Sequence, residues 1–243
     1  MEKIQENNKE EKELKLETSR FNLSTETLAY LKQARQDLRE LQKIAPFISG
    51  VSFLGSRMVG NEKKDSDLDC IICYNKEELT KNNGGISSLK FVDIIDEYNS
   101  KYSKTFESFK KWLKEINIKN DIKIPYHVAG VVDISESGIV EIIEKFYLYL
   151  ESNSDTSEKY ATRYVWPIVT PFFFSLGNDV YKARQKILSE LSKRDDGEKL
   201  WKEIVEHLSL IERDIKTEKR DSLPKYKTYP KTIEEAKKFF KLQ

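Results

Sequence analysis

An Asp-x-Asp pair, Asp67 and Asp69, leads directly into a short apolar run in this 243-residue chain. The run continues as Cys70-Ile71-Ile72-Cys73, which predicts a buried strand. Because side chains alternate between the two faces of a strand, both carboxylates should point the same way. Two carboxylates held this close repel each other unless a cation lies between them, and their hard oxygen atoms suit Mg²⁺ or Mn²⁺. The pair therefore predicts a site for a divalent metal.

A Gly-Ser step lies upstream of the aspartates. A first apolar run, Val51-Ser52-Phe53-Leu54, stops at Gly55-Ser56, and a polar stretch then leads to Asp67. Glycine lets other groups approach the backbone closely. Ser56 offers a hydroxyl and an N–H where we expect a short helix to begin, and such a position attracts phosphate. One loop would then hold phosphate, and the next strand would hold its metal.

This order of elements resembles the nucleotidyltransferase superfamily typified by DNA polymerase β, in particular its small bacterial members. The shared pattern is an apolar strand, Gly-Ser, a spacer and Asp-x-Asp in a second strand. Arg57, Gly60 and Ser66 add to the likeness. The resemblance covers roughly residues 46–135 and does not extend into the C-terminal part.

The resemblance implies an enzyme that transfers a nucleoside monophosphate from an NTP to an acceptor and releases pyrophosphate. The acceptor, which stays unknown, could be a small molecule, a protein or an RNA end. Asp67 and Asp69 would hold two Mg²⁺ (or Mn²⁺) ions. Gly55 and Ser56 would seat the β- and γ-phosphates, with assistance from Arg57.

Further residues take roles that rest on the same resemblance. The family has a third metal-binding carboxylate on a later strand, and Asp133, between two apolar residues of segment 122–134, matches it. His127 would share a face with Asp133 on a regular strand, although a packed histidine is the commoner role. Family members often carry a basic residue on a helix after the core that meets the triphosphate, which points to Lys182 or Arg184. A solvated helix face explains these two residues equally well.

Two of these patterns also have simpler explanations. An Asp-Ser-Asp sequence in a polar loop is typical of a turn whose side chains cap backbone N–H groups. Cys70 and Cys73, the only cysteines of the chain, have the C-x-x-C spacing of redox pairs and half-sites for zinc. On a strand, however, residues three apart face opposite sides, and there is no second cysteine pair to complete a zinc site. We expect both cysteines to pack as small apolar residues.

The composition is rich in charge, with 38% hydrophobic and 34% charged residues. No apolar stretch is long enough to span a bilayer, and the first residues lack a signal-peptide core, so we expect a cytoplasmic protein that does not contact membranes. The 42 basic and 41 acidic residues nearly cancel. This balance argues against long nucleic acid as the main partner. It does not exclude tRNA, because the net charge does not reveal a local basic patch.

We predict an α/β (α+β) fold: a small mixed nucleotidyltransferase sheet flanked by helices and followed by a C-terminal helical bundle. The expected division is a polar lead-in (1–20), a core with an N-terminal helix (21–152), and a helical domain with a basic tail (153–243). Apolar runs predict strands at 51–54, 70–73 and 122–134. Amphipathic spacing predicts helices at 24–45, 87–117, 137–150, 179–192 and 198–215, and a short helix near the C-terminus. The aromatic-rich stretch 160–174 could be the core of the bundle or could stack on a nucleobase.

The sequence leaves three other functions open. Within the superfamily, the chain could synthesise a nucleotide second messenger, or it could be a toxin–antitoxin component that modifies its partner. In a different class, it could be a non-catalytic protein that binds a nucleotide or a partner protein. The nucleobase, the acceptor and the oligomeric state are not readable from these motifs.

Overall fold

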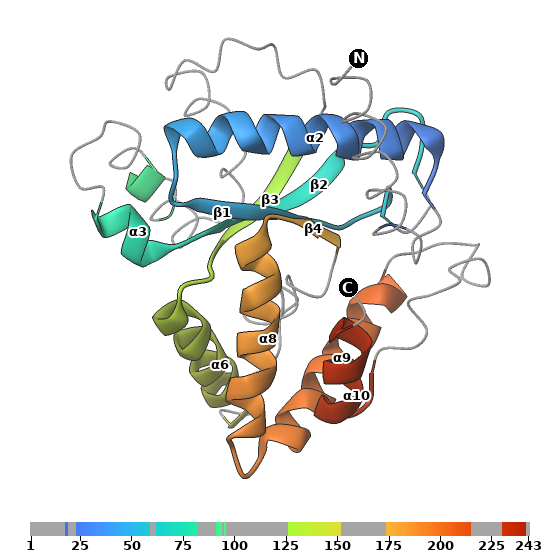
Figure 1. The fold of residues 1–243 in the computed structure, drawn as a ribbon. Coiled ribbons are helices and arrows are strands. Elements are labelled where there is room, and N and C mark those ends of the chain that lie inside the picture. Colours follow the sequence, from blue (N-terminus) through green and yellow to red (C-terminus); the bar gives the residue numbers. More distant parts are fainter. Residues whose placement is uncertain are drawn as a thin grey trace.

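The computed structural model describes residues 18, 23–58, 62–81, 91–93, 95, 126–151, 174–214 and 230–241. These residues form a mixed sheet with one long helix across one face and a group of helices against the other (Figure 1). The predicted α/β class, a small mixed sheet flanked by helices with further helices in the C-terminal part, is confirmed.

Within the described residues, the sheet has four strands in the order β3-β2-β1-β4. They are β1 (Ile48–Phe53), β2 (Leu68–Tyr74), β3 (Tyr126–Asp133) and β4 (Phe174–Leu176). Strand β1 is antiparallel to β2 and β4, whereas β2 and β3 are parallel. The end of β1 therefore meets the beginnings of the other three strands. We call this end of the strands the Asp69 end of the sheet and the opposite end the Asp133 end.

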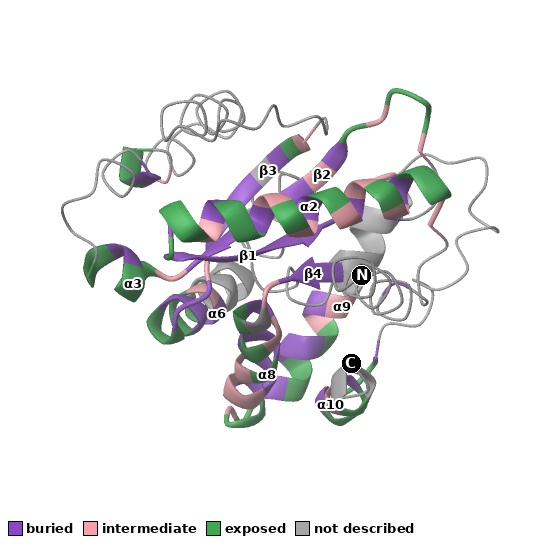
Figure 2. Ribbon diagram, turned by 45° about the horizontal axis from the view of Figure 1, so that its top comes forward, coloured by how far each residue is buried: buried purple, intermediate pink, exposed green. Residues whose placement is uncertain are grey.

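Helix α2 (Thr25–Ile44) covers one face of the sheet. Its N-terminus is capped, because the Ser24 hydroxyl accepts a hydrogen bond from the Thr27 N–H at 3.1 Å. Apolar residues at helical spacing form its buried stripe: Leu31, Ala34, Leu38 and Leu41. Exposed and buried residues alternate along α2 where it crosses the strands (Figure 2). The stripe packs on side chains of the sheet that include Phe53, Cys70 and Val128.

The other face is covered by helices from later in the chain. They are α6 (Glu136–Glu151), α8 (Asn178–Ser192), α9 (Gly197–Asp214) and α10 (Ile233–Lys241). A second core joins Ile71 and Cys73 to Val180, Ile187 and Trp201. Cys70 and Cys73 are thus buried in opposite cores, which confirms that they pack as small apolar residues. The short α3 (Lys76–Lys81) follows β2.

The structure divides the chain differently from the predicted boundary at 152/153. Strand β4, which follows that boundary, pairs with β1, and α8 then packs under the same sheet. A Cβ added to Gly50 would lie 2.5 Å from Val180 Cγ2, so this glycine allows the close approach of α8 to β1. The described parts of the helices from α8 onward therefore share a core with the sheet.

Several predicted segments lie outside the described residues. These are the lead-in apart from Thr18, most of the predicted helix 87–117, the aromatic stretch before Phe174, and most of the basic tail. Residues 91–93 and 95 are helical, as predicted, while Phe174 belongs to a strand. None of the helices in the described ranges is both long enough and apolar enough to cross a membrane.

Candidate functional site

Gly55 and Asp69 meet at the Asp69 end of the sheet. Gly55 has a φ of +79°, and a Cβ added to it would lie 1.9 Å from Asp69 Oδ2. The Leu54 N–H donates to the Asp69 carbonyl oxygen at 3.0 Å, which holds the two chain segments together. Only a residue without a side chain fits here, since the carboxylate occupies the space of a Cβ and the positive φ disfavours L-residues.

His127 is the neighbour of Asp69 on the adjacent strand. The parallel register pairs the two residues, and His127 Nδ1 lies 2.7 Å from Asp69 Oδ1. The Asp69 side chain is 27% exposed and that of His127 48%. Burial raises the pKa of the Asp69 carboxyl above its usual value; His127 opposes this shift, and the nearby charge of Asp67 adds to it. Asp69 is therefore a partly desolvated carboxylate beside a second acid.

Asp67 and Asp69 are the two predicted metal ligands that the structure brings together. Asp67 is exposed and immediately precedes β2, and its charge acts on Asp69. The donor set of two carboxylates fits Mg²⁺ or Mn²⁺, and the bare glycine leaves Asp69 Oδ2 uncrowded by a neighbouring Cβ. Among the described residues, no three His, Cys, Asp or Glu side chains form a metal-binding group. Substrate phosphates and water would have to complete the coordination, as is common for Mg²⁺.

Ser56 lies beside Gly55 and is half-buried. The Met58 N–H donates to the Gly55 carbonyl oxygen at 3.1 Å, so residues 55–58 form a turn where we expected a helix to begin. The segment just after Met58 lies outside the described part of the chain. Ser56 thus remains at the position predicted for phosphate contact, on a turn that starts with the glycine.

Arg57 does not take the position expected of a phosphate ligand. It is only 1% exposed, its Nε donates to the Ser66 carbonyl oxygen at 2.8 Å, and its Nη1 pairs with Glu26 Oε2 at 3.0 Å. The guanidinium also lies 4.6 Å from the centre of the Tyr30 ring. Arg57 therefore connects the loop between β1 and β2 to α2. The predicted role of this residue in binding nucleotide is wrong for this conformation.

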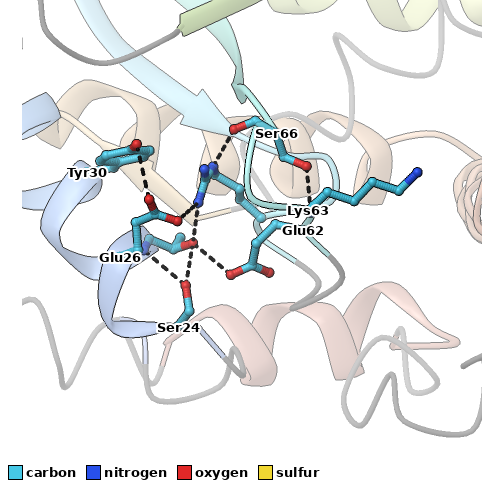
Figure 3. A network of polar contacts seen from close by, with 8 residues as sticks. Ser24, Glu26, Tyr30, Glu62, Lys63 and Ser66 are labelled. Atoms are coloured by element: carbon cyan, nitrogen blue, oxygen red, sulfur yellow. Dashed lines mark hydrogen bonds and ion pairs between the residues drawn. The ribbon is translucent and has the colours of Figure 1, made fainter.

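Additional contacts extend this attachment, which we call the loop clasp: Ser24, Glu26, Thr27, Tyr30, Arg57, Glu62, Lys63 and Ser66 (Figure 3). The Thr27 hydroxyl donates to Glu62 Oε1 at 3.3 Å. The Lys63 N–H donates to the Ser66 hydroxyl at 2.8 Å. Because the loop connects Gly55 to Asp67, the clasp fixes the segment that carries the site. Glu26 lies in the first turn of α2, and no local sequence pattern indicates that it contacts this loop.

Asp133 lies at the opposite end of the sheet from the aspartate pair. It pairs in register with Tyr74, whereas Asp69 pairs with His127. Asp69 and Tyr74 are five positions apart on β2, so roughly 17 Å of strand separates the two ends at the usual rise. Asp133 Oδ1 accepts hydrogen bonds from the N–H groups of Lys76 at 3.1 Å and Ser135 at 2.9 Å. The prediction that Asp133 is the third carboxylate of the metal site is therefore wrong. Its carboxylate instead accepts the N–H of the first residue of α3 and the N–H of the residue just before α6.

An irregularity in β3 also separates the faces of His127 and Asp133. Cys70 pairs with Val128, but the next residue of β2 pairs with Gly130, so β3 carries one extra residue. As a result, Val128 packs in the core under α2, whereas Val132 packs in the other core. The two residues would share a face only on a regular strand, and this strand is not regular.

The two basic residues predicted to meet the triphosphate have other partners. Lys182 is exposed on α8 and pairs with Asp179 at 2.7 Å. Arg184 is 1% exposed and lies 5.0 Å from the centre of the Tyr181 ring. The Tyr181 hydroxyl donates to the Ser175 carbonyl oxygen at 2.6 Å. The Tyr181 hydrogen bond attaches α8 to β4, whereas the Lys182–Asp179 ion pair lies within α8.

Comparisons of the chain with protein-family models, with curated proteins and with solved structures gave no match.

Proposed function

We propose that this chain is a metal-dependent nucleotidyltransferase that moves a nucleoside monophosphate from an NTP to an acceptor and releases pyrophosphate. One observation carries the proposal: the Asp69 carboxylate lies directly over Gly55, and Asp67 stands beside it. Acidic groups thus lie against a turn that begins with a glycine at the end of a strand. This arrangement suits a cation that bridges carboxylates and phosphate oxygens.

The proposed roles follow from the chemistry of each residue. Asp67 and Asp69 would hold Mg²⁺ or Mn²⁺, which supplies positive charge against the developing charge on the phosphates. Ser56 offers a hydroxyl and an amide to phosphate oxygens next to Gly55. The exposure of Asp67 leaves room for an acceptor and water on its side of the site. Positioning and electrostatics would account for most of the rate enhancement.

The direct test measures pyrophosphate release from each of the four NTPs with Mg²⁺ or Mn²⁺, with cell extract as the source of acceptor. Asp67→Asn/Asp69→Asn should abolish release. Asp65→Asn is the matched control, since Asp65 is an exposed acid of the same loop. Release that persists in the double variant would refute the assignment of the metal ligands.

A non-catalytic nucleotide-binding or interaction protein is the second candidate. One observation favours it: the residue beside Asp69 on the adjacent strand is His127, where a third carboxylate would complete an acidic site. Thermal-shift binding of NTP without pyrophosphate release under any metal would support this function. Release that depends on Asp67 and Asp69 would exclude it.

A further inference from the structure

The two oxygens of the Asp69 carboxylate have different surroundings. Oδ1 lies 2.7 Å from His127 Nδ1, whereas Oδ2 lies over the backbone of Gly55. An ionised carboxylate only accepts hydrogen bonds, so the imidazole donates Nδ1–H in this pair. The imidazole therefore binds one oxygen and leaves the other directed at the glycine turn.

We propose that His127 is a positioning residue that orients the Asp69 carboxylate so that Oδ2 is presented to a divalent cation above Gly55. This inference rests on the proposed function, because that function supplies the cation. Carboxylates that bind metals are commonly fixed by a hydrogen bond to the oxygen that does not face the metal, and the loss of such a partner weakens metal binding.

The backbone of His127 is anchored on both sides, as a positioning role requires. The Tyr126 hydroxyl donates to Asp37 Oδ2 of α2 at 2.8 Å, and Val128 is buried in the core under α2. The parallel register then places His127 opposite Asp69. The imidazole is thereby held at the carboxylate by the fold as well as by its own hydrogen bond.

An imidazole at position 127 also avoids further repulsion between carboxylates when no metal is bound. Asp67 already raises the pKa of Asp69 through like-charge repulsion, although less than burial does. A third carboxylate at position 127 would add to this repulsion whenever the cation is absent. A histidine instead donates a hydrogen bond and keeps Asp69 in one orientation before the cation arrives.

The test uses Mn²⁺ alone as the probe and measures its binding from the loss of the free-ion electron paramagnetic resonance signal. His127→Leu removes the donor and should weaken Mn²⁺ binding about 10–100-fold, the range found when such supporting partners are lost. His127→Asn keeps an N–H donor near the position of Nδ1 and should restore binding to within about threefold of wild type. His207→Leu, on α9, is the control for replacing a histidine.

Each outcome decides the proposal. Wild-type Mn²⁺ affinity in His127→Leu would overturn it, as would a wild type that binds no Mn²⁺ at millimolar concentration. If His127→Asn binds as weakly as His127→Leu, the donor role of His127 is refuted, and tighter binding in His127→Asp would then identify position 127 as a direct ligand. Pyrophosphate assays on the same samples separate the two proposals, since donor-dependent Mn²⁺ binding without any release leaves the positioning role intact and refutes the transferase.

Discussion

The two ends of the sheet each carry an aspartate at the edge of an apolar strand, yet they differ in what surrounds the carboxylate. At one end, Asp133 accepts two backbone N–H groups, one from the first residue of α3 and one from the residue just before α6. At the other end, the Asp69 carboxylate contacts the exposed imidazole of His127 and lies over Gly55, and the charge of Asp67 acts on it. Backbone donors satisfy the first carboxylate as part of the fold, while the second is kept partly desolvated beside another acid. Such an arrangement favours a functional role over a structural one.

The largest expected effect is on turnover, and it should separate Asp69 from Asp133. Asp69→Asn should lower NTP-dependent pyrophosphate release by at least about 10³-fold, because a ligand of the cation that stabilises transition-state charge is lost. Asp133→Asn should keep kcat per folded molecule within about twofold, since the residue lies roughly 17 Å away along the sheet. Steady-state rates corrected for the folded fraction measure both. A comparable loss of kcat in Asp133→Asn would contradict the assignment of function to the Asp69 end alone.

The glycines that face these carboxylates provide a matched pair. A Cβ at Gly55 would lie 1.9 Å from Asp69 Oδ2, and a Cβ at Gly138 would lie 2.4 Å from Asp133 Oδ2. Gly55→Ala should displace the Asp69 carboxylate and reduce turnover about 100-fold, the effect of misplacing a reacting group by about 1 Å. Gly138→Ala should reduce stability and leave kcat unchanged. Turnover and urea unfolding of both variants test this, and equal losses of kcat would contradict it.

The loop clasp gives a smaller effect, because it acts on the site through the loop. Arg57→Met leaves the Ser66 carbonyl oxygen and Glu26 without their guanidinium partner, which should cost about 1–3 kcal/mol in the free energy of unfolding. A looser loop should also raise KM for the NTP more than it lowers kcat. Lys64→Met, at an exposed position of the same loop, is the control. If Arg57 contacts phosphate instead, kcat will fall sharply while stability hardly changes.

Local patterns in the sequence were sufficient to predict much of this structure. The helix capped by Ser24, the strands that flank the Gly-Ser turn and the helices after β3 all follow from periodicity and capping. The proximity of Asp67 and Asp69 follows from their spacing. These features depend on residues that are close together in the chain.

The wrong predictions concern contacts between distant segments. Asp133 has the expected apolar flanks, but the register of two parallel strands decides which residue lies beside Asp69, and that residue is His127. The extra residue in β3 also reverses the expected faces. The burial of Arg57 depends on α2, far upstream, and the three-residue β4 is too short to show alternation. Pairing register and tertiary burial are not encoded in local spacing.

The smallest expected effect concerns stability rather than activity. Burial raises the folded-state pKa of the Asp69 carboxyl above its unfolded value. Its contribution to stability is therefore complete below the unfolded pKa and is lost as pH rises through the folded pKa. Without metal, Asp69→Asn should consequently melt slightly above wild type at pH 7, and this difference should shrink as the pH falls toward 4. Thermal unfolding in EDTA across this range measures it. A variant that melts below wild type at pH 7 would show that the His127 hydrogen bond outweighs burial. The Asp69 end would then resemble the Asp133 end, where replacing the carboxylate weakens its hydrogen bonds with two backbone N–H groups.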